Sequence, residues 1–254
     1  MTIRFVALLA VFALVSGTTQ SASRLPARSD GGMVVSVSEI SSEVGVEIMN
    51  AGGNAIDAAV AVAFSLAVTW PSAGNLGGGG FMVIYLADER RATAIDYREM
   101  APRQAHRDMY LDQEGNVIEG GPTDGHLSVA VPGTVAGLIY ALEKYGQLPL
   151  ETVIAPAISL ARDGFPVSDY LEASFERAEE RLGIHPESSR LFLRNGNAYQ
   201  AGDRFMQPDL AATLTRIAKN GSDGFYTGRT ADLIVAEMRR GGGLIDQEDL
   251  EGYT

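Results

Sequence analysis

The feature that most constrains the fold is a helical segment with almost no charge. Thirteen consecutive residues starting at Ala58 carry no charged side chain, and Asp57 is the only charged residue in the range Ala55–Thr69. Asn54 is a favoured N-cap residue, and Pro71 follows the segment and stops a helix. A helix on the surface would show a polar stripe. We therefore expect Ala55–Thr69 to be a helix that is buried on nearly all sides, and it is too short to span a membrane.

The segments around this helix predict an antiparallel hairpin and further helices. Phe81–Leu86 and Ala92–Tyr97 are rich in strand-forming residues and are separated by a polar turn. Met33–Val37 is typical of another short strand, and we expect a helix capped by Ser41 or Ser42 after it. The later expected elements are helices at Thr134–Lys144, Leu150–Arg162, Leu171–Arg181, Pro208–Lys219 and Arg229–Arg240, and a small hairpin around Asn195-Gly196. This pattern predicts an α+β fold with helices packed over a largely antiparallel sheet.

The first residues are typical of a secretory signal peptide. Arg4 is followed by the apolar run Phe5–Val15 and then by small polar residues up to Ser23. The apolar run is shorter than the roughly 20 residues that a membrane span needs, although a short anchor is the alternative. We therefore expect residues 1–23 to be a signal peptide, residues 24–254 to be the mature domain, and the protein to be periplasmic or secreted without a stable membrane anchor.

Charge and residue types exclude several kinds of function. Lys and Arg total 20 against 32 Asp and Glu, a net charge of −12 that disfavours nucleic acid or an anionic membrane as a partner. The chain has no Cys, which excludes thiolate catalysis, disulfides and cysteine-ligated zinc. The three histidines (His106, His126 and His185) lack the spacing of metal ligands. We expect them to be surface or capping residues, and we expect no metal site.

A glycine-rich segment leads into the first strand of the predicted hairpin. Residues 77–80 are four consecutive glycines, and a strand follows them. A phosphate-binding loop or a dinucleotide fingerprint needs a helix after its glycines, so nucleotide binding is disfavoured. Close backbone packing and close approach to a ligand both remain as explanations. No nucleophile elbow is present, because Val135 stands where the motif Gly133–Gly137 would need Ser, so we assign no catalytic residue.

Arg98 is the one candidate binding residue. It follows the second predicted strand in the sequence Asp96-Tyr97-Arg98-Glu99. Its planar guanidinium matches a carboxylate in two-point contact, which suits the α-carboxylate of an amino acid. The alternative is an ordinary ion pair with Asp96 or Glu99.

Several longer motifs, taken together, resemble the γ-glutamyltranspeptidase family. They run in the order of that family from about Gly31 to Tyr253. The motifs are Ser42–Ile48, Gly52–Ala61, Leu76–Met82, Asp96–Pro102, Val131–Gly137, Leu160–Pro166, Gln207–Ala211, Gly224–Tyr226 and Gly241–Leu250. The resemblance identifies the chain as the N-terminal part of a large subunit of that family.

The resemblance implies an N-terminal-nucleophile hydrolase. Such a protein folds as an αββα sandwich and cleaves itself into a large and a small subunit, and the new N-terminal Thr of the small subunit is the nucleophile. The family cleaves the γ-glutamyl amide of glutathione and related donors, transfers the glutamyl group to water or to amino acids and peptides, and needs no cofactor. Arg98 matches the arginine of the family that binds the glutamyl α-carboxylate, so the resemblance favours substrate binding over the ordinary ion pair.

The chain departs from the family pattern, because the self-cleavage Thr and the oxyanion-hole glycines of the small subunit have no counterpart in it. Thr254 is no substitute, since the Thr of the family lies much further along. We expect the fold to be incomplete, with exposed apolar surface, and the chain to be inactive without its small-subunit partner. The alternatives are a cephalosporin or glutaryl acylase, a relative that processes poly-γ-glutamate, and a non-catalytic exported glutamyl-binding protein.

Overall fold

The computed structural model describes residues 26–254, so the expected signal peptide at residues 1–23 lies outside the described residues. The chain divides into two units: the first ends at Met33, and the second begins at Val34. Within the first unit, residues 26–33 form neither helix nor strand, and the Ser29 hydroxyl accepts a hydrogen bond from the Gly32 amide at 3.4 Å. The second unit, Val34–Thr254, contains every helix and strand described below.

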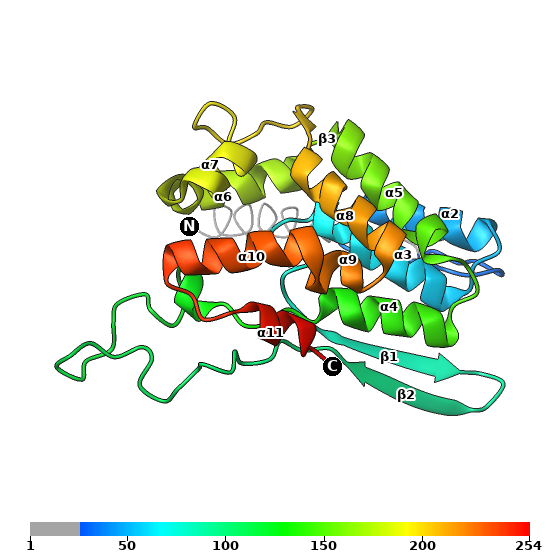
Figure 1. The fold of residues 1–254 in the computed structure, drawn as a ribbon. Helices are drawn as coiled ribbons and strands as arrows, with labels where there is room; N and C mark the ends of the chain where they lie inside the picture. The colour runs from blue at the N-terminus through cyan, green and yellow to red at the C-terminus, as the bar shows by residue number, and fades with distance from the viewer. Residues whose placement is uncertain (1–25) are drawn as a thin grey trace, which may run out of the picture. The chain divides into compact units, whose positions relative to one another are not determined.

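Helix α3 (Ala55–Thr69) lies at the centre of the second unit. It packs against α2 (Glu39–Asn50), α4 (Thr134–Tyr145) and α5 (Leu150–Asp163), as Figure 1 shows. The side chains of Val60, Phe64 and Val68 are fully inaccessible to solvent, and 10 of its 15 residues are buried. The prediction of a helix buried on nearly all sides is therefore confirmed.

The single charge of α3 is also buried, and the backbone around it explains why. The Asp57 side chain accepts hydrogen bonds from the amides of Gln147 at 2.9 Å and Leu148 at 3.0 Å, in the turn between α4 and α5. Its other oxygen accepts from the Asn54 amide at 2.7 Å and completes a capping box at the start of α3. A buried carboxylate is stable only when its oxygens are satisfied in this way. Asp57 thus fixes the start of α3 to the α4–α5 turn.

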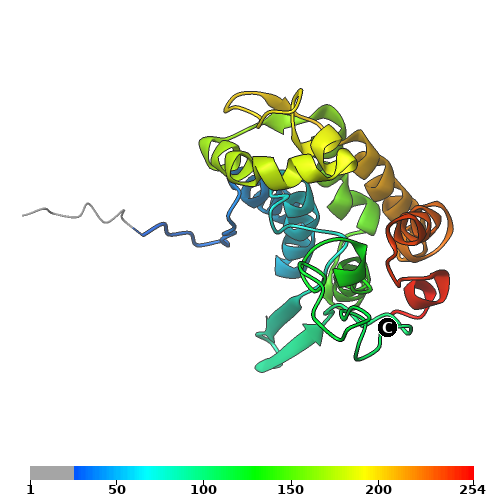
Figure 2. The ribbon, with the colours of Figure 1, turned by 90° about the vertical axis from the view of Figure 1, so that its left-hand side faces the viewer.

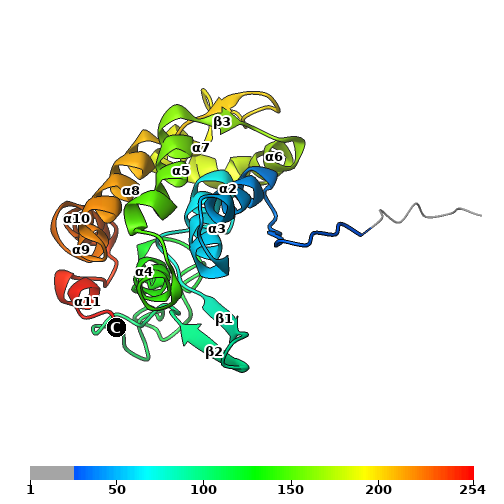
Figure 3. The same cartoon turned by 90° about the vertical axis from the view of Figure 1, so that its right-hand side faces the viewer.

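The predicted hairpin is confirmed as β1 (Phe81–Leu86) paired antiparallel with β2 (Arg91–Asp96). Its inner face includes Ile84 and Ile95, which are buried. Its outer face exposes Phe81, Val83 and Tyr85 by 61%, 77% and 66%. Figure 3 shows this hairpin beside α4 with one side uncovered. The expected exposed apolar surface is therefore present on the described part of the chain.

The remaining elements are helical apart from one short strand pair. The five helices predicted for the second half are present with ends shifted by at most three residues, and α5 continues through Pro156. The other elements are η1 (His126–Ser128), β3 (Phe165–Pro166), α6 (Asp169–Ile184), α7 (Pro186–Phe192), β4 (Arg204–Phe205), α8 (Pro208–Asn220), α9 (Asp223–Tyr226), α10 (Gly228–Gly241) and α11 (Gln247–Glu251). No helix within residues 26–254 has the length and apolar character needed to cross a membrane.

Two local predictions were wrong, and a third was only partly right. Met33–Val37 forms no strand, because no other strand of the described chain pairs with it. Helix α2 begins earlier than expected, since the Ser38 hydroxyl accepts from the Ser41 amide and is the actual N-cap. The hairpin expected around Asn195-Gly196 is present only as a tight turn closed by a single bridge between Arg194 and Asn197, because α7 extends to Phe192 just before the turn.

Candidate functional site

Arg98 lies just after β2, where the chain leaves the hairpin. Its side chain is 62% exposed, and its guanidinium carbon lies 5.9 Å from the centre of the Phe81 ring. The Arg98 amide donates to the Asp96 carboxylate at 3.0 Å, which fixes the turn at the end of the strand. The guanidinium is therefore presented to solvent at the edge of the open hairpin face.

Glu99 is the ion-pair partner of Arg98 within residues 26–254. Arg98 Nε and Glu99 Oε2 are 3.0 Å apart, so the ordinary ion pair considered from the sequence is formed. The contact lacks hydrogen-bond alignment, and this buried carboxylate oxygen accepts no hydrogen bond from the described residues. The two Nη nitrogens of Arg98 make no hydrogen bond to residues 26–254 either. The guanidinium thus retains donors that suit a second carboxylate.

The glycine cluster lies directly against the backbone that carries Arg98. A Cβ atom at Gly79 would overlap the Tyr97 carbonyl oxygen and crowd the backbone of Arg98. Gly80 exchanges backbone hydrogen bonds with Tyr97, at 3.0 and 3.3 Å. Close backbone packing therefore explains Gly79, whereas a Cβ at Gly80 would crowd the ring of Tyr97 at 3.0 Å, so a side chain at either position would press on the residue that leads into Arg98.

A second glycine pair fits around the Tyr97 ring and carbonyl group. A Cβ at Gly137, in α4, would overlap the ring, and a Cβ at Gly133 would overlap the Tyr97 carbonyl oxygen. Burial raises the pKa of the Tyr97 phenol, which therefore stays protonated at neutral pH. Just beyond Arg98, Met100 and Val131 form an antiparallel bridge with N···O distances of 3.0 and 2.8 Å. The residues on both sides of Arg98 are thus fixed by backbone contacts.

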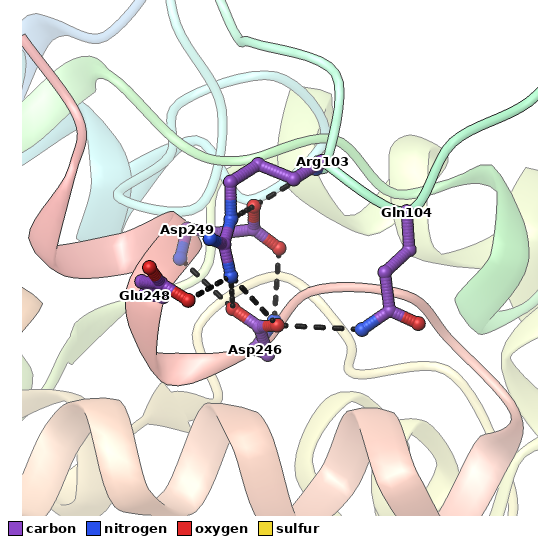
Figure 4. Close-up of polar contacts among 5 residues, drawn as sticks. All are labelled: Arg103, Gln104, Asp246, Glu248 and Asp249. Atoms are coloured by element: carbon purple, nitrogen blue, oxygen red, sulfur yellow. Dashed lines mark hydrogen bonds and ion pairs between the residues drawn. The ribbon is translucent and has the colours of Figure 1, made fainter.

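Helix α11 holds the segment that follows Arg98. The Arg103 amide donates to Asp249 Oδ1 at 2.9 Å, and the Arg103 guanidinium contacts Asp246, Glu248 and Asp249 (Figure 4). The Asp249 side chain is 1% exposed, so this ion pair is partly shielded from water. These acidic neighbours, Glu248 first, raise the pKa of Arg103. Sequence reasoning missed this contact, although the Asp-x-x-Asp spacing of a capping box at Asp246 was a visible signal for α11.

The histidines have structural positions. His126 lies in η1, and its Nε2 is 2.7 Å from Glu237 Oε1 on α10. His185 joins α6 to α7 at a helix cap position. Within residues 26–254, no histidine nitrogen bonds a serine or threonine hydroxyl, and no three His, Cys, Asp or Glu side chains are grouped to hold a metal ion. His185 fits the expectation of a surface or capping histidine, whereas His126 is only 21% exposed and is held in an ion pair with Glu237.

The comparison with known protein families explains why these elements occur together. A family model described as Gamma-glutamyltranspeptidase matches residues 41–254. The chain belongs to the gamma-glutamyltranspeptidase family. Within this family, the chain is 50% identical over 237 residues to a glutathione hydrolase proenzyme of Pseudomonas sp. (strain A14). That match covers 92% of this chain but 40% of the relative.

Solved structures of related proteins share this fold. The crystal structure of Helicobacter pylori gamma-glutamyltranspeptidase is 44% identical, with a TM-score of 0.88, over 91% of this chain and 66% of that one. A cephalosporin acylase from Bacillus halodurans is 28% identical, with a TM-score of 0.74, over 92% of this chain and 45% of that one. The predicted fold class, an α+β N-terminal-nucleophile hydrolase fold of which this chain holds a part, is thereby confirmed.

Proposed function

We propose that this chain is the glutamyl-recognising part of an enzyme that cleaves γ-glutamyl amides such as glutathione. The glutamyl group passes to water or to the amine of an amino acid or peptide. Family membership supports this proposal, and so does the similarity to relatives named glutathione hydrolase proenzyme and gamma-glutamyltranspeptidase. The chain spans about 40% of the length of the curated relative, so the chemical step is assigned to the whole precursor.

Arg98 is the observation that carries the proposal. Its guanidinium is exposed, its backbone is fixed on both sides, and its two Nη nitrogens have no partner within residues 26–254. In the proposed complex, this side chain binds the α-carboxylate of the glutamyl donor in two-point contact. Glu99 then keeps its ion pair with Nε, on the other edge of the guanidinium. Binding places the donor for attack but moves no proton itself.

The proposed partner is the small subunit of the same precursor, which supplies the nucleophilic hydroxyl. That hydroxyl attacks the γ-carbonyl carbon, the amide C–N bond breaks, and the amine leaves with a proton. The resulting ester is then cleaved by water or by an acceptor amine. The uncovered row of Phe81, Val83 and Tyr85 supports this partnership, because apolar strand faces of this kind are normally covered in a complete sandwich.

A hybrid precursor tests the proposed role of Arg98. In it, residues 41–254 of this chain replace the matching segment of the Pseudomonas sp. (strain A14) relative. Loss of a charged two-point contact costs about 1.5 to 3 kcal/mol, so Arg98→Ala should lower kcat/KM for γ-glutamyl p-nitroanilide about tenfold to hundredfold. The kcat/KM of Arg98→Lys should lie between those of the wild type and Arg98→Ala, because lysine keeps the positive charge but lacks the two-point geometry of the guanidinium.

Two controls make this test specific. Arg91→Ala removes an arginine on the same hairpin with a similar exposure, 52%, and should leave kcat/KM unchanged. The donor 4-aminobutyryl p-nitroanilide lacks the α-carboxylate, so Arg98→Ala should not weaken its cleavage. An equal loss with both donors would contradict the carboxylate-binding role.

A second candidate is an acylase that cleaves glutaryl amides, and the similarity to a cephalosporin acylase supports acylase activity in general. A glutaryl group carries the same terminal carboxylate but lacks the amino group, so Arg98 suits either donor. Comparing the hybrid on γ-glutamyl and glutaryl p-nitroanilide separates the two, and we expect the γ-glutamyl donor to react faster. If the protein only binds glutamyl groups, the hybrid should cleave neither anilide. Titration of the 254-residue chain with glutamate should still give a calorimetric binding signal.

We also propose that residues 1–23 are a cleaved signal peptide and that the mature protein is periplasmic or secreted. The charged start, short apolar run and small polar exit support this. Mass spectrometry of the protein exported by a Gram-negative host should give an N-terminus at Ser23 or Arg24. Recovery only in the cytoplasm, with residues 1–23 intact, would contradict export.

A further inference from the structure

Tyr253 contacts the backbone of Arg98, although 155 residues separate them in sequence. The Tyr253 hydroxyl donates a hydrogen bond to the Arg98 carbonyl oxygen at 2.8 Å. Burial, followed by the nearby carboxylates of Asp96 and Glu99, raises the pKa of Tyr253. The hydroxyl therefore remains protonated at neutral pH and able to donate. The Arg98 side chain is mostly exposed, so few contacts hold its guanidinium in place. The position of the side chain therefore depends on contacts of the Arg98 backbone such as this hydrogen bond.

Tyr253 is itself held in place by rigid neighbours. Its ring stacks on that of Tyr226, with centroids 5.7 Å apart and an interplanar angle of 10°. The Tyr226 hydroxyl donates to the Pro132 carbonyl oxygen at 2.9 Å and accepts from the Ala136 amide at 3.2 Å. Between these groups lies Gly133, where a Cβ atom would overlap the Tyr253 hydroxyl. The two phenols thus connect Arg98 to the start of α4.

The same C-terminal segment holds the chain a second time, five residues after Arg98. Asp249, in α11, accepts the Arg103 amide at 2.9 Å and pairs with the Arg103 guanidinium (Figure 4). Figure 2 shows α11, in red, beside the loop that leaves β2. Both contacts come from Asp246–Tyr253, which we name the α11 brace. The brace holds residues 98–103 at both ends.

We propose that Tyr253 is a positioning residue for Arg98, and that the α11 brace sets where the donor carboxylate binds. This inference rests on the proposed function, because it gives Tyr253 a role only through Arg98. A fixed carbonyl limits the directions in which a long, exposed side chain can extend. Removing the hydroxyl should therefore weaken recognition of the carboxylate while the stacked ring stays in place.

A double-mutant cycle in the hybrid precursor tests this role. Tyr253→Phe should lower kcat/KM for γ-glutamyl p-nitroanilide about threefold to tenfold, the range expected for one lost hydrogen bond. In the Arg98→Ala background the same change should have no further effect, because its effect passes through Arg98. It should also leave cleavage of the 4-aminobutyryl donor unchanged. Tyr170→Phe, an exposed tyrosine at the start of α6, is the matched control and should change neither donor.

The outcomes separate this inference from the proposed function. If Arg98→Ala alone leaves kcat/KM unchanged, the proposed function fails, whatever Tyr253→Phe does. If Arg98→Ala acts as expected but Tyr253→Phe costs the same factor in both backgrounds, or nothing, the positioning role is overturned.

Hydrogen exchange on the 254-residue chain gives a second readout that needs no activity. Tyr253→Phe should speed exchange in peptides covering residues 97–103, where the Met100 and Arg103 amides are hydrogen-bonded. Exchange in α3 should not change. Unchanged exchange in 97–103 would show that the hydroxyl does not hold this segment, and would overturn the inference.

Discussion

Asp57 is the position at which a minimal substitution should have a large effect on stability. Asp57→Asn changes one carboxylate oxygen to an amide nitrogen and adds two hydrogens. The native side chain is fully buried and accepts from three backbone amides, those of Asn54, Gln147 and Leu148. An asparagine can offer one oxygen to these donors, so its NH₂ group must face at least one N–H group.

The contacts give the size of the effect. One buried amide left without an acceptor costs about 1 to 3 kcal/mol, and the surviving hydrogen bonds lose their charged partner, at about 1 kcal/mol each. The neutral amide is easier to bury than a carboxylate, which offsets part of this loss. We expect Asp57→Asn to lower the free energy of unfolding by about 2 to 4 kcal/mol. Asp57→Ala, which leaves all three amides unpaired, should cost about 3 to 5 kcal/mol.

Urea unfolding of the 254-residue chain, followed by far-UV circular dichroism, measures this change. With a slope of about 3 kcal/mol per molar urea, the midpoint for Asp57→Asn should fall by about 1 M. Asp232→Asn, at an exposed position of α10, is the matched control and should stay within about 0.5 kcal/mol of wild type. Equal midpoints for the two asparagine variants would refute the conclusion that the Asp57 carboxylate satisfies these amides.

Two further predictions concern packing and charge. Gly133→Ala should destabilise the fold by about 1 to 3 kcal/mol, because the new methyl group would overlap its neighbours. Backbone strain does not contribute, since the φ angle of −114° suits alanine. Gly183→Ala, in the open on α6, should be neutral or stabilise by up to about 1 kcal/mol, and equal urea midpoints for the two would contradict this reasoning. Arg240, and then His126, lower the pKa of Glu237 to about 2 from its ordinary 4.5. This carboxylate should therefore add stability above pH 4.5 that is lost as the pH falls towards 2. In Glu237→Gln, the free energy of unfolding should depend less on pH between pH 5 and 2 than it does in the wild type. The side chain is 44% exposed, so the effect should stay below about 1 kcal/mol and shrink in high salt; an unchanged pH profile in the variant would count against it.

The elements with strong local signals were predictable from the sequence. The bounds of α3 were predicted to the residue, because an asparagine cap, a long uncharged run and a following proline act within one stretch of chain. The hairpin β1–β2 was predicted within one residue for the same reason, since its strand formers flank a short polar turn. Met33–Val37 failed because a strand exists only with a partner, and its own residues do not supply one.

The surroundings of Arg98 were not predictable in the same way. Carboxylate binding by Arg98 could be inferred from the sequence, because an arginine follows the second predicted strand. The family resemblance then gave the role proposed for it. The contacts of Tyr253 with Arg98 and of Asp249 with Arg103 join residues 155 and 146 positions apart. No local pattern marks a tyrosine as the donor to a distant carbonyl group. The four glycines were visible, but only the structure decided that packing explains Gly79 and Gly80.

The geometry of Arg98 links recognition to the chemical step that the precursor would perform. The carboxylate proposed to bind Arg98 and the carbonyl carbon to be attacked are separated only by the short glutamyl carbon chain. A shift of the Arg98 backbone would therefore move the reacting carbon by nearly the same amount, and small misplacements of a reacting atom are costly. An exposed arginine on a mobile loop could supply affinity, but it could not supply this placement. The close packing around Tyr97 and the α11 brace fix the position of Arg98. Neither touches the guanidinium, but both restrict the backbone that carries it.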